Sequence, residues 1–218
     1  MEVAEHLIAA GELRDRFASL VRRLGGSHDP AAAADTLLAA WAEPGRTYHA
    51  TTHLVDCLAR LDELVDGPED HDAIETALWY HDGVYEPRAS DNEERSAAGA
   101  ERALIELGIA HRVAGEVGRL IRLTRHTAPP NDEAGRVVCD IDLSILGRRT
   151  AEFDAYDAAI REEYAWLEEE TYRAGRRRIL AAILARETIY ETVTFKERYE
   201  APARANLRRA LARLEAPR

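Results

Sequence analysis

The sequence predicts an all-α protein, and three observations carry that prediction. Apolar residues recur at helical spacing along most of the 218 residues. Nowhere does the chain alternate apolar and polar residues convincingly, as a half-buried strand does. Hydrophobic residues make up 46% of the chain, which is enough to form a buried core. The spacing predicts roughly ten helices, and it shows no internal repeat and no low-complexity tract.

The individual helices are predicted from their apolar stripes and from end signals. A stripe over residues 13–24 stops at Gly25-Gly26, and Asp29-Pro30 then has the pattern of a cap followed by Pro at the first helical position. Ser90 and Glu93 have the spacing of a capping box, and Gly108 ends the helix that follows. A loop is predicted at residues 127–135, which include Pro129-Pro130. The other stripes lie at about residues 37–41, 48–64, 74–81, 113–121, 137–146, 153–167, 179–184 and 203–214.

Composition and charge indicate which kinds of molecule the protein can bind. The chain has 29 basic and 40 acidic residues, a formal net charge of −11, which disfavours binding to a nucleic acid polymer. No apolar run approaches the roughly 20 residues of a membrane helix, and the first ten residues lack the basic start of a signal peptide. Cys57 and Cys139 form no paired-ligand motif and are interpreted as buried thiols in a reducing compartment. We expect a cytoplasmic protein with a small-molecule partner and no membrane contact; the sequence does not predict its oligomeric state.

The strongest local signal is His81-Asp82, at the end of an apolar helix. His81 continues the buried stripe of that helix, so its side chain is expected to point inward. An aspartate is costly to bury unless it is paired or bound to a metal ion. The alternative is a histidine favoured by the carboxyl end of a helix, followed by a loop aspartate.

Other residues support a metal site. His53 lies upstream on a polar stripe, and Asp140 and Asp142 interrupt an apolar segment downstream. Two imidazoles and two carboxylates form a mixed nitrogen and oxygen site, which suits a divalent ion such as Mn, Fe, Co, Ni, Zn or Mg. Such an ion can lower the pKa of bound water and polarise a phosphoryl oxygen.

The order His53, His81-Asp82 and a distant aspartate resembles the H…HD…D pattern of the HD-domain metal-dependent phosphohydrolases. The wider pattern resembles a small stand-alone bacterial subfamily of predicted HD hydrolases, from about Leu13 to Leu211. The segments that carry the likeness are YHATTHL at 48–54, ALWYHDGVY at 77–85 and DIDLSILG at 140–147, with Asp91-Asn92-Glu93 and Ser96-Ala97, Arg161-Glu162-Glu163-Tyr164, and Ala203-Arg204-Ala205-Asn206-Leu207.

The resemblance implies a fold and a ligand set. It implies a single HD-type helical bundle over residues 1–218, with a metal-site core at about 46–147 and C-terminal helices at 150–214 packed on it. The implied ligands are His53, His81, Asp82 and a downstream aspartate. Asp140 and Asp142 face about 200° apart on a helix, so they cannot easily serve one site together. The family signature favours Asp142, which is followed by Leu143-Ser144.

Residues near these segments are candidates for catalysis or for lining the site. Asp91 or Glu93 is a candidate to orient water or act as general base, although helix capping explains Glu93 equally well. Arg46 and Arg88 lie in loops that adjoin ligand segments and are candidates to bind phosphate. The further candidates are His49, one turn before His53, His126, Asn92 and Asp140.

These observations favour a metal-dependent hydrolase acting on a small phosphate ester, such as a nucleotide-like molecule. One alternative is an HD-fold oxygenase with two irons, for which His49 and His126 would supply extra ligands. Another is a protein without catalysis that binds a nucleotide or a structural metal ion.

Overall fold

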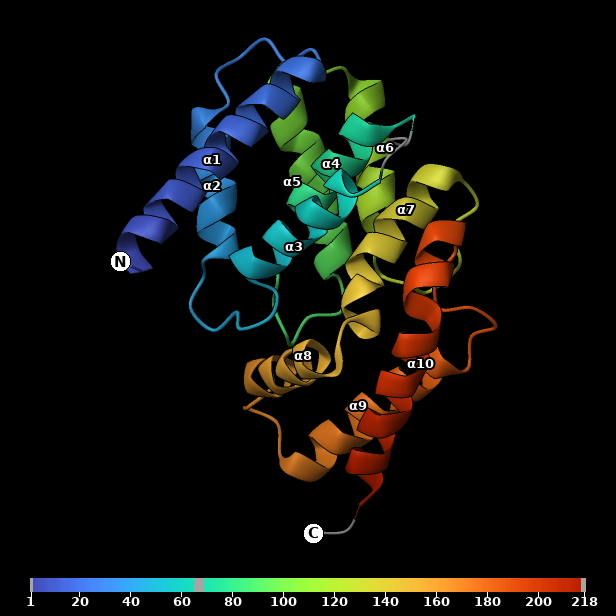
Figure 1. The fold of residues 1–218 in the computed structure, drawn as a ribbon. Coiled ribbons are helices and arrows are strands. Elements are labelled where there is room, and N and C mark those ends of the chain that lie inside the picture. The colour runs from blue at the N-terminus through green and yellow to red at the C-terminus, as the bar shows by residue number, and fades with distance from the viewer. Residues whose placement is uncertain (1, 65–68, 217–218) are drawn as a thin grey trace. The chain divides into compact units, whose positions relative to one another are not determined.

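The protein is all-helical over residues 2–64 and 69–216, the ranges described by the computed structural model (Figure 1). These ranges contain ten α-helices and one 3-10 helix, and no strand. The all-α prediction is therefore confirmed. No described helix combines the length and the apolar composition that crossing a membrane requires.

The chain divides into two compact units, residues 1–128 and 129–218. The first contains α1 (Glu2–Arg23), α2 (Ala31–Trp41), α3 (Thr51–Asp62), α4 (His71–Tyr80), α5 (Asn92–Glu106) and α6 (His111–Leu123). The second contains α7 (Glu133–Asp142), the 3-10 helix η1 (Leu143–Gly147), α8 (Thr150–Glu163), α9 (Glu169–Leu184) and α10 (Val193–Glu215). The single HD-type bundle with its C-terminal helices on the metal-site core stays a prediction.

Helix α4 is the core helix of the first unit. Seven consecutive residues, Ile74 to Tyr80, are buried, and α4 contacts α1, α3, α5 and α6. Trp79 packs edge-on against Phe17 of α1, with ring centroids 5.2 Å apart. The Nε1–H of Trp41 in α2 donates to the carbonyl oxygen of Trp79 at 2.9 Å. A helix buried this fully is held from several sides, and only its ends can present polar groups to a site.

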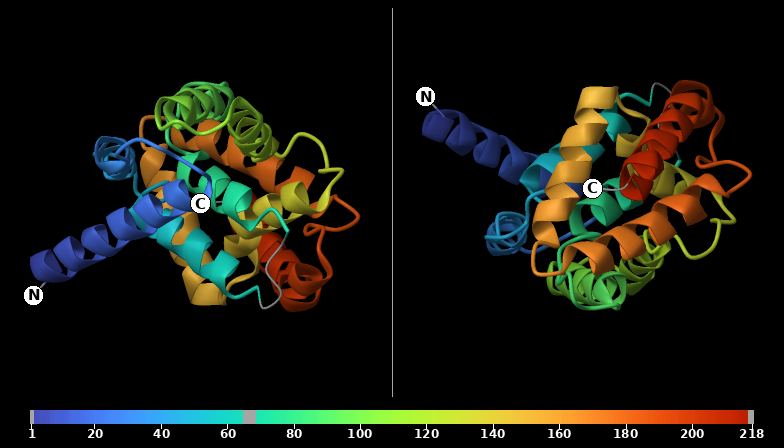
Figure 2. Two further views of the ribbon diagram at one scale, coloured as in Figure 1. Left: turned by 90° about the horizontal axis from the view of Figure 1, so that it is seen from above. Right: turned by 90° about the horizontal axis from the view of Figure 1, so that it is seen from below.

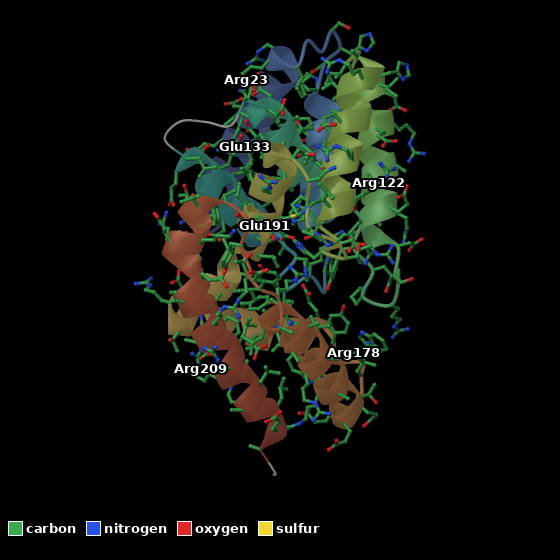
Figure 3. All side chains as sticks on the ribbon, turned by 90° about the vertical axis from the view of Figure 1, so that its right-hand side faces the viewer. Arg23, Arg122, Glu133, Arg178, Glu191 and Arg209 are labelled. Atoms are coloured by element: carbon green, nitrogen blue, oxygen red, sulfur yellow. The ribbon has the colours of Figure 1, made fainter. Side chains whose placement is uncertain are left out.

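Helices α5 and α6 lie side by side along the first unit, whereas the N-terminal part of α1 extends beyond its neighbours (Figure 2). Arg122 of α6, which is labelled in Figure 3, pairs with Glu94 and Glu101 of α5 at 2.7 Å each. The predicted end at Gly108 is confirmed: this glycine has φ +79°, and the N–H of Ile109 donates to the carbonyl of Leu104.

Three predicted helix starts differ from the structure. Helix α5 begins at Asn92 with Asp91 as its cap residue and no side-chain cap, so the capping box at Ser90 is wrong. Helix α7 begins at Glu133, inside the predicted loop, because the Asp132 carboxylate accepts the N–H of Gly135 at 2.8 Å and caps the helix. Pro30 is the cap residue of α2 rather than its first helical residue, and Asp29 accepts the N–H of Ala31.

In the second unit, α10 is anchored against η1. The Nδ2 of Asn206 donates to the carbonyls of Leu146 and Arg148, at 2.9 Å each. Gly147 lies so close to Tyr199 that a Cβ there would come within 2.5 Å of that side chain. The anchor therefore requires a glycine on η1 and a buried amide on α10.

Candidate metal centre

The centre is built from the first turn of α3 and the end of α4. His53 lies on the buried face of α3 with Leu54 and Cys57, and only 5% of it is exposed. His81 is the C-terminal cap residue of α4 and is buried, as its place in the apolar stripe predicts. Asp82 follows in the turn after α4.

The three predicted ligands of the first unit converge. The Nε2 atoms of His53 and His81 lie 3.2 Å apart. The Oδ2 of Asp82 lies 3.2 Å from Nε2 of His81 and 3.9 Å from Nε2 of His53. Residues separated by 28 positions thus point their donor atoms at one small volume.

The hydrogen bond of His81 fixes the orientation of its ring. Its Nδ1 lies 2.9 Å from the carbonyl oxygen of Leu78, one turn earlier in α4. Because a carbonyl only accepts, Nδ1 carries the proton, and in the neutral ring Nε2 presents a lone pair. This backbone contact is the usual support of a metal-binding imidazole.

The separations fit one metal ion. Bonds of about 2.0–2.2 Å to nitrogen and oxygen allow two donors on one ion to lie at most about 4.4 Å apart. All three separations, 3.2, 3.2 and 3.9 Å, are below this limit. The donor set of two imidazoles and a carboxylate suits a divalent transition metal.

The electrostatics of Asp82 keep it ionised. Burial raises the pKa of its carboxyl group. The imidazoles of His81, His49 and His53 in their protonated form, together with a hydrogen bond from His81, lower the pKa by more, so it lies well below its usual range. Asp82 is thus held as a carboxylate, the form that binds metal.

Aromatic rings surround the donor atoms. The ring of Trp41 lies 5.4 Å from that of His81, and the ring of Tyr48 lies 4.7 Å from that of His53. His49 stacks on Tyr85 with centroids 4.1 Å apart, and its ring lies 6.2 Å from that of His53. The prediction that His49 is on the same helix as His53 is wrong, since α3 begins at Thr51; the preceding turn nevertheless brings His49 to the site.

Arg46 contacts the backbone of the turn that carries Asp82. Its Nη1 donates to the carbonyl oxygen of Asp82 at 2.5 Å, its Nη2 pairs with Glu43 at 2.8 Å, and its side chain is only 4% exposed. Its guanidinium also lies over the ring of Tyr85, 5.6 Å from the centroid. In this arrangement Arg46 holds the turn that carries Asp82, whereas binding of phosphate by Arg46 stays a prediction.

Cys57 is a candidate ligand that the sequence interpretation missed. Its Sγ lies 3.7 Å from Nε2 of His53, and with His53 and His81 it forms a buried group that could hold a metal ion. Cys57 follows His53 by four residues, so the two share a helix face. That spacing was the available signal, but a lone cysteine on an apolar stripe is typical of core residues.

A second group that could hold a metal ion, His71, Asp72 and Glu75, lies at the other end of α4. Here the carboxylates are already paired with α1. Glu75 bonds to Arg16 at 2.6 Å and to Arg23 at 2.5 Å, and Asp72 bonds to Arg23 at 2.7 Å. A metal ion would have to displace two guanidinium groups, so this group is better explained as an ion-pair network.

The two downstream aspartates differ in their surroundings. Asp140 is buried, and its oxygens accept the N–H of Glu191, the N–H of Thr192 and the hydroxyl of Thr192 at 2.7–2.8 Å. Burial raises the pKa of Asp140 to about 6, although these hydrogen bonds lower it. Asp140 therefore anchors the start of α10. Asp142 is partly exposed in the second unit and stays a predicted ligand.

The remaining candidates lie around α5 and α6. Asp91 is exposed and lies 4.0 Å from Arg95, while Glu93 is half-buried in the first turn of α5. The amide of Asn92 bonds to both the N–H and the carbonyl of Glu86 and so closes the loop after Asp82. Arg88 is exposed in this loop, and His126 has a left-handed backbone with φ 54° after α6. The catalytic roles of these residues stay predictions, and Asn92 has a clear structural one.

Comparisons with known protein families, curated proteins and solved structures found no match for this chain.

Proposed function

We propose that the first unit binds a divalent metal ion through His53, His81 and Asp82, and that the protein is a metal-dependent phosphohydrolase. The observation that supports this most is the convergence of these three donors within 3.2–3.9 Å. Their order in the chain is that of the H…HD pattern, which the sequence resembles.

When bound, the metal ion would supply positive charge that lowers the pKa of water and polarises a phosphoryl oxygen. The residues of the chain would prepare the site for that role. The carbonyl of Leu78 orients His81, and Arg46 holds the carbonyl of Asp82. His53 and His81 are buried, with the ring of Tyr48 beside one imidazole and that of Trp41 beside the other, so little water reaches them. A rigid, partly dry site strengthens the electrostatic interactions inside it.

The proposed substrate is a small phosphate ester of the nucleotide-like class. Tyr85, three residues after Asp82 in the chain, supplies an aromatic ring that stacks on His49 and has the Arg46 guanidinium 5.6 Å from its centroid. An aromatic ring of this kind can stack on a base. Asp142 would be the fourth ligand, and Asp91 or Glu93 would orient the attacking water.

The position of Cys57 favours a second candidate function, a metal site without catalysis. Four protein ligands, namely His53, Cys57, His81 and Asp82, would close a tetrahedral site and leave no position for substrate. A thiolate would also shift the metal preference toward zinc or iron and away from magnesium.

Metal analysis and an activity panel test the proposal together. The full-length protein is purified, stripped with EDTA and reloaded separately with Mn, Co, Ni, Mg or Zn. Phosphate release is then measured on nucleoside monophosphates, cyclic nucleotides and simple phosphate esters. We expect about one ion per chain and metal-dependent turnover, with turnover lost and metal affinity strongly reduced in His81→Ala and Asp82→Ala. Folded variants that keep wild-type activity would overturn the proposal.

Cobalt substitution separates the two candidate functions. A thiolate ligand gives an intense sulfur-to-cobalt charge-transfer band, which would disappear in Cys57→Ala. The hydrolase proposal predicts no such band and predicts that Cys57→Ala retains its metal ion. Cys139→Ala is the matched control, because Cys139 is the other buried thiol.

A further inference from the structure

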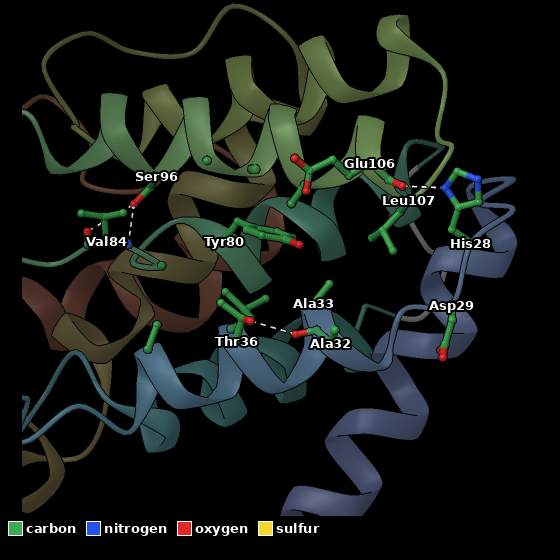
Figure 4. A pocket seen from close by; sticks show the side chains of 16 residues that line it. His28, Asp29, Ala32, Ala33, Thr36, Tyr80, Val84, Ser96, Glu106 and Leu107 are labelled. Atoms are coloured by element: carbon green, nitrogen blue, oxygen red, sulfur yellow. Dashed lines mark hydrogen bonds between the residues drawn. The ribbon is translucent and has the colours of Figure 1, made fainter.

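A pocket of about 440 Å³ lies between α2 and α5, within the first unit (Figure 4). It exists because the facing positions of the two helices carry little side-chain volume. Ala33 and Ala40 line it from α2, and Gly99 and Ala103 line it from α5. Its volume is within the range typical of small-molecule sites.

Tyr80 of α4 lines the pocket with a buried hydroxyl group that lacks a hydrogen-bond partner. The residue is only 7% exposed, and its hydroxyl has no hydrogen-bond partner in the structure. Figure 4 shows the hydroxyl end of the ring directed into the space between α2 and α5. A phenol hydroxyl is an O–H donor at neutral pH. An unpaired buried hydroxyl costs free energy, which an acceptor from a ligand would remove.

The other hydroxyls of the lining are already paired. Thr36 donates to the carbonyl of Ala32 at 2.8 Å, and Ser96 accepts the N–H of Val84 at 3.0 Å. Tyr80 is therefore the lining hydroxyl that a ligand can satisfy without breaking a bond within the protein.

The charge of the lining restricts the ligand. The lining contains no lysine or arginine, and Asp29 and Glu106 are its carboxylate-bearing residues. His28 closes one end by bonding through Nδ1 to the backbone carbonyl of Glu106 at 2.6 Å. An anionic ligand, including a phosphate ester, would meet no fixed positive side chain here.

We propose that this pocket binds an uncharged, mainly apolar organic molecule whose carbonyl or similar acceptor bonds to the Tyr80 hydroxyl. The hydroxyl is nearly closed to water in the structure, so the acceptor enters with a small movement of a lining side chain such as Leu107. The pocket is distinct from the proposed metal centre. Tyr80 and Gly83 line the pocket, whereas the two residues that separate them in the sequence, His81 and Asp82, are proposed metal ligands.

Three two-ring probes of similar shape test the chemistry. Benzophenone is neutral and has a carbonyl acceptor, diphenylmethane lacks the acceptor, and 4-benzoylbenzoate adds a negative charge. Binding to the full-length protein is measured by NMR titration. We expect saturable binding of benzophenone, at least fivefold weaker binding of diphenylmethane, and the weakest binding for 4-benzoylbenzoate. Irradiation of bound benzophenone should cross-link it to peptides from α2 and α5.

Two variants locate the site. Tyr80→Phe removes only the hydroxyl and should weaken benzophenone binding about fivefold without changing that of diphenylmethane. Gly99→Leu should abolish binding of both, because a Cβ at Gly99 meets nothing within 4 Å and the new side chain fills the pocket. Gly115→Leu is the matched control, since Gly115 is also open, lies on α6 and does not line the pocket.

No saturable binding of benzophenone, equal binding by Tyr80→Phe, or cross-links confined to other segments would each overturn the proposal. Tighter binding of 4-benzoylbenzoate than of benzophenone would overturn the assigned charge. These results do not depend on the metal centre, because neither variant changes a proposed ligand.

Discussion

Both ends of α4 carry histidine and carboxylate side chains, but the groups that surround these side chains differ between the two ends. At its N-terminal end, Asp72 and Glu75 face the guanidinium groups of Arg16 and Arg23. At its C-terminal end, the groups around the Asp82 carboxylate are the imidazoles of His81, His53 and His49. A guanidinium group is always charged and neutralises a carboxylate without a metal ion. A neutral imidazole instead offers a nitrogen lone pair that can bind a metal ion. A group of histidine and carboxylate side chains is therefore a candidate metal site only when no permanent cation already pairs with the carboxylate.

The largest expected effect is the loss of stability on removing Glu75. Its side chain is 2% exposed, and its two oxygens bond to two arginines of α1. Loss of one partner of a buried pair typically costs about 3–5 kcal/mol, and we expect about 3 kcal/mol for Glu75→Ala because the arginines remain partly exposed. Urea unfolding in EDTA measures this change through a lower midpoint.

The exposed pair of Arg14 and Asp35 provides the control for Glu75. Asp35→Ala should change stability by less than about 1 kcal/mol, as is usual for a surface pair. Metal content should be the same in both variants. If Glu75→Ala lost metal but kept its stability, the N-terminal group of α4 would be the metal site instead.

The next effect is on metal affinity. We expect His81→Ala to weaken binding of Zn²⁺ or Mn²⁺ about 100-fold, which is about 2.8 kcal/mol. His71→Ala is the matched control, because His71 lies at the opposite end of the same helix in the other group. Competition with a chromophoric chelator measures both affinities. Equal losses in the two variants would remove the distinction between the two ends.

The sequence indicated which polar side chains of the first unit meet, because helical spacing and the cost of burying charge point to the same residues there. His81 continues an apolar stripe, so its burial followed from spacing alone, and Asp82 had to be paired or bound. The resemblance connected them to His53, and the contact of 3.2 Å between the two Nε2 atoms bears out the convergence of these residues.

Other features could not be predicted because they depend on contacts between segments far apart in the chain. Asp140 was a candidate ligand by its sequence, yet it bonds to Thr192, which lies 52 residues away. Arg46 was selected as a loop cation, and its contact with the carbonyl of Asp82 depends on how two turns meet. The unpaired hydroxyl of Tyr80 could not be predicted either, because a sequence shows which residues carry donors but not whether those donors find acceptors in the fold.

A smaller effect is expected from the residue that holds the Asp82 turn. Arg46→Ala should weaken metal binding about tenfold, the lower end of the range for supporting residues of metal ligands. Glu43→Gln is the control: Glu43 pairs with Arg46 but is mostly exposed, so its loss should change affinity little. The chelator competition used for His81 measures both. An unchanged affinity in Arg46→Ala would show that the Asp82 turn is held by other contacts.

The smallest expected effect is the change in stability of Tyr80→Phe, and whether stability rises or falls is informative. Tyr80 precedes His81 by one residue, so a general disturbance of the end of α4 would reduce metal binding. The structure predicts unchanged metal affinity, because the Tyr80 ring lines the α2–α5 pocket and the variant keeps that ring. Since the hydroxyl lies buried without a partner, its removal should leave stability equal or raise it by up to about 1 kcal/mol. Urea unfolding and chelator competition on the same sample separate the two effects, and a clear loss of stability would mean that the hydroxyl has a partner in solution.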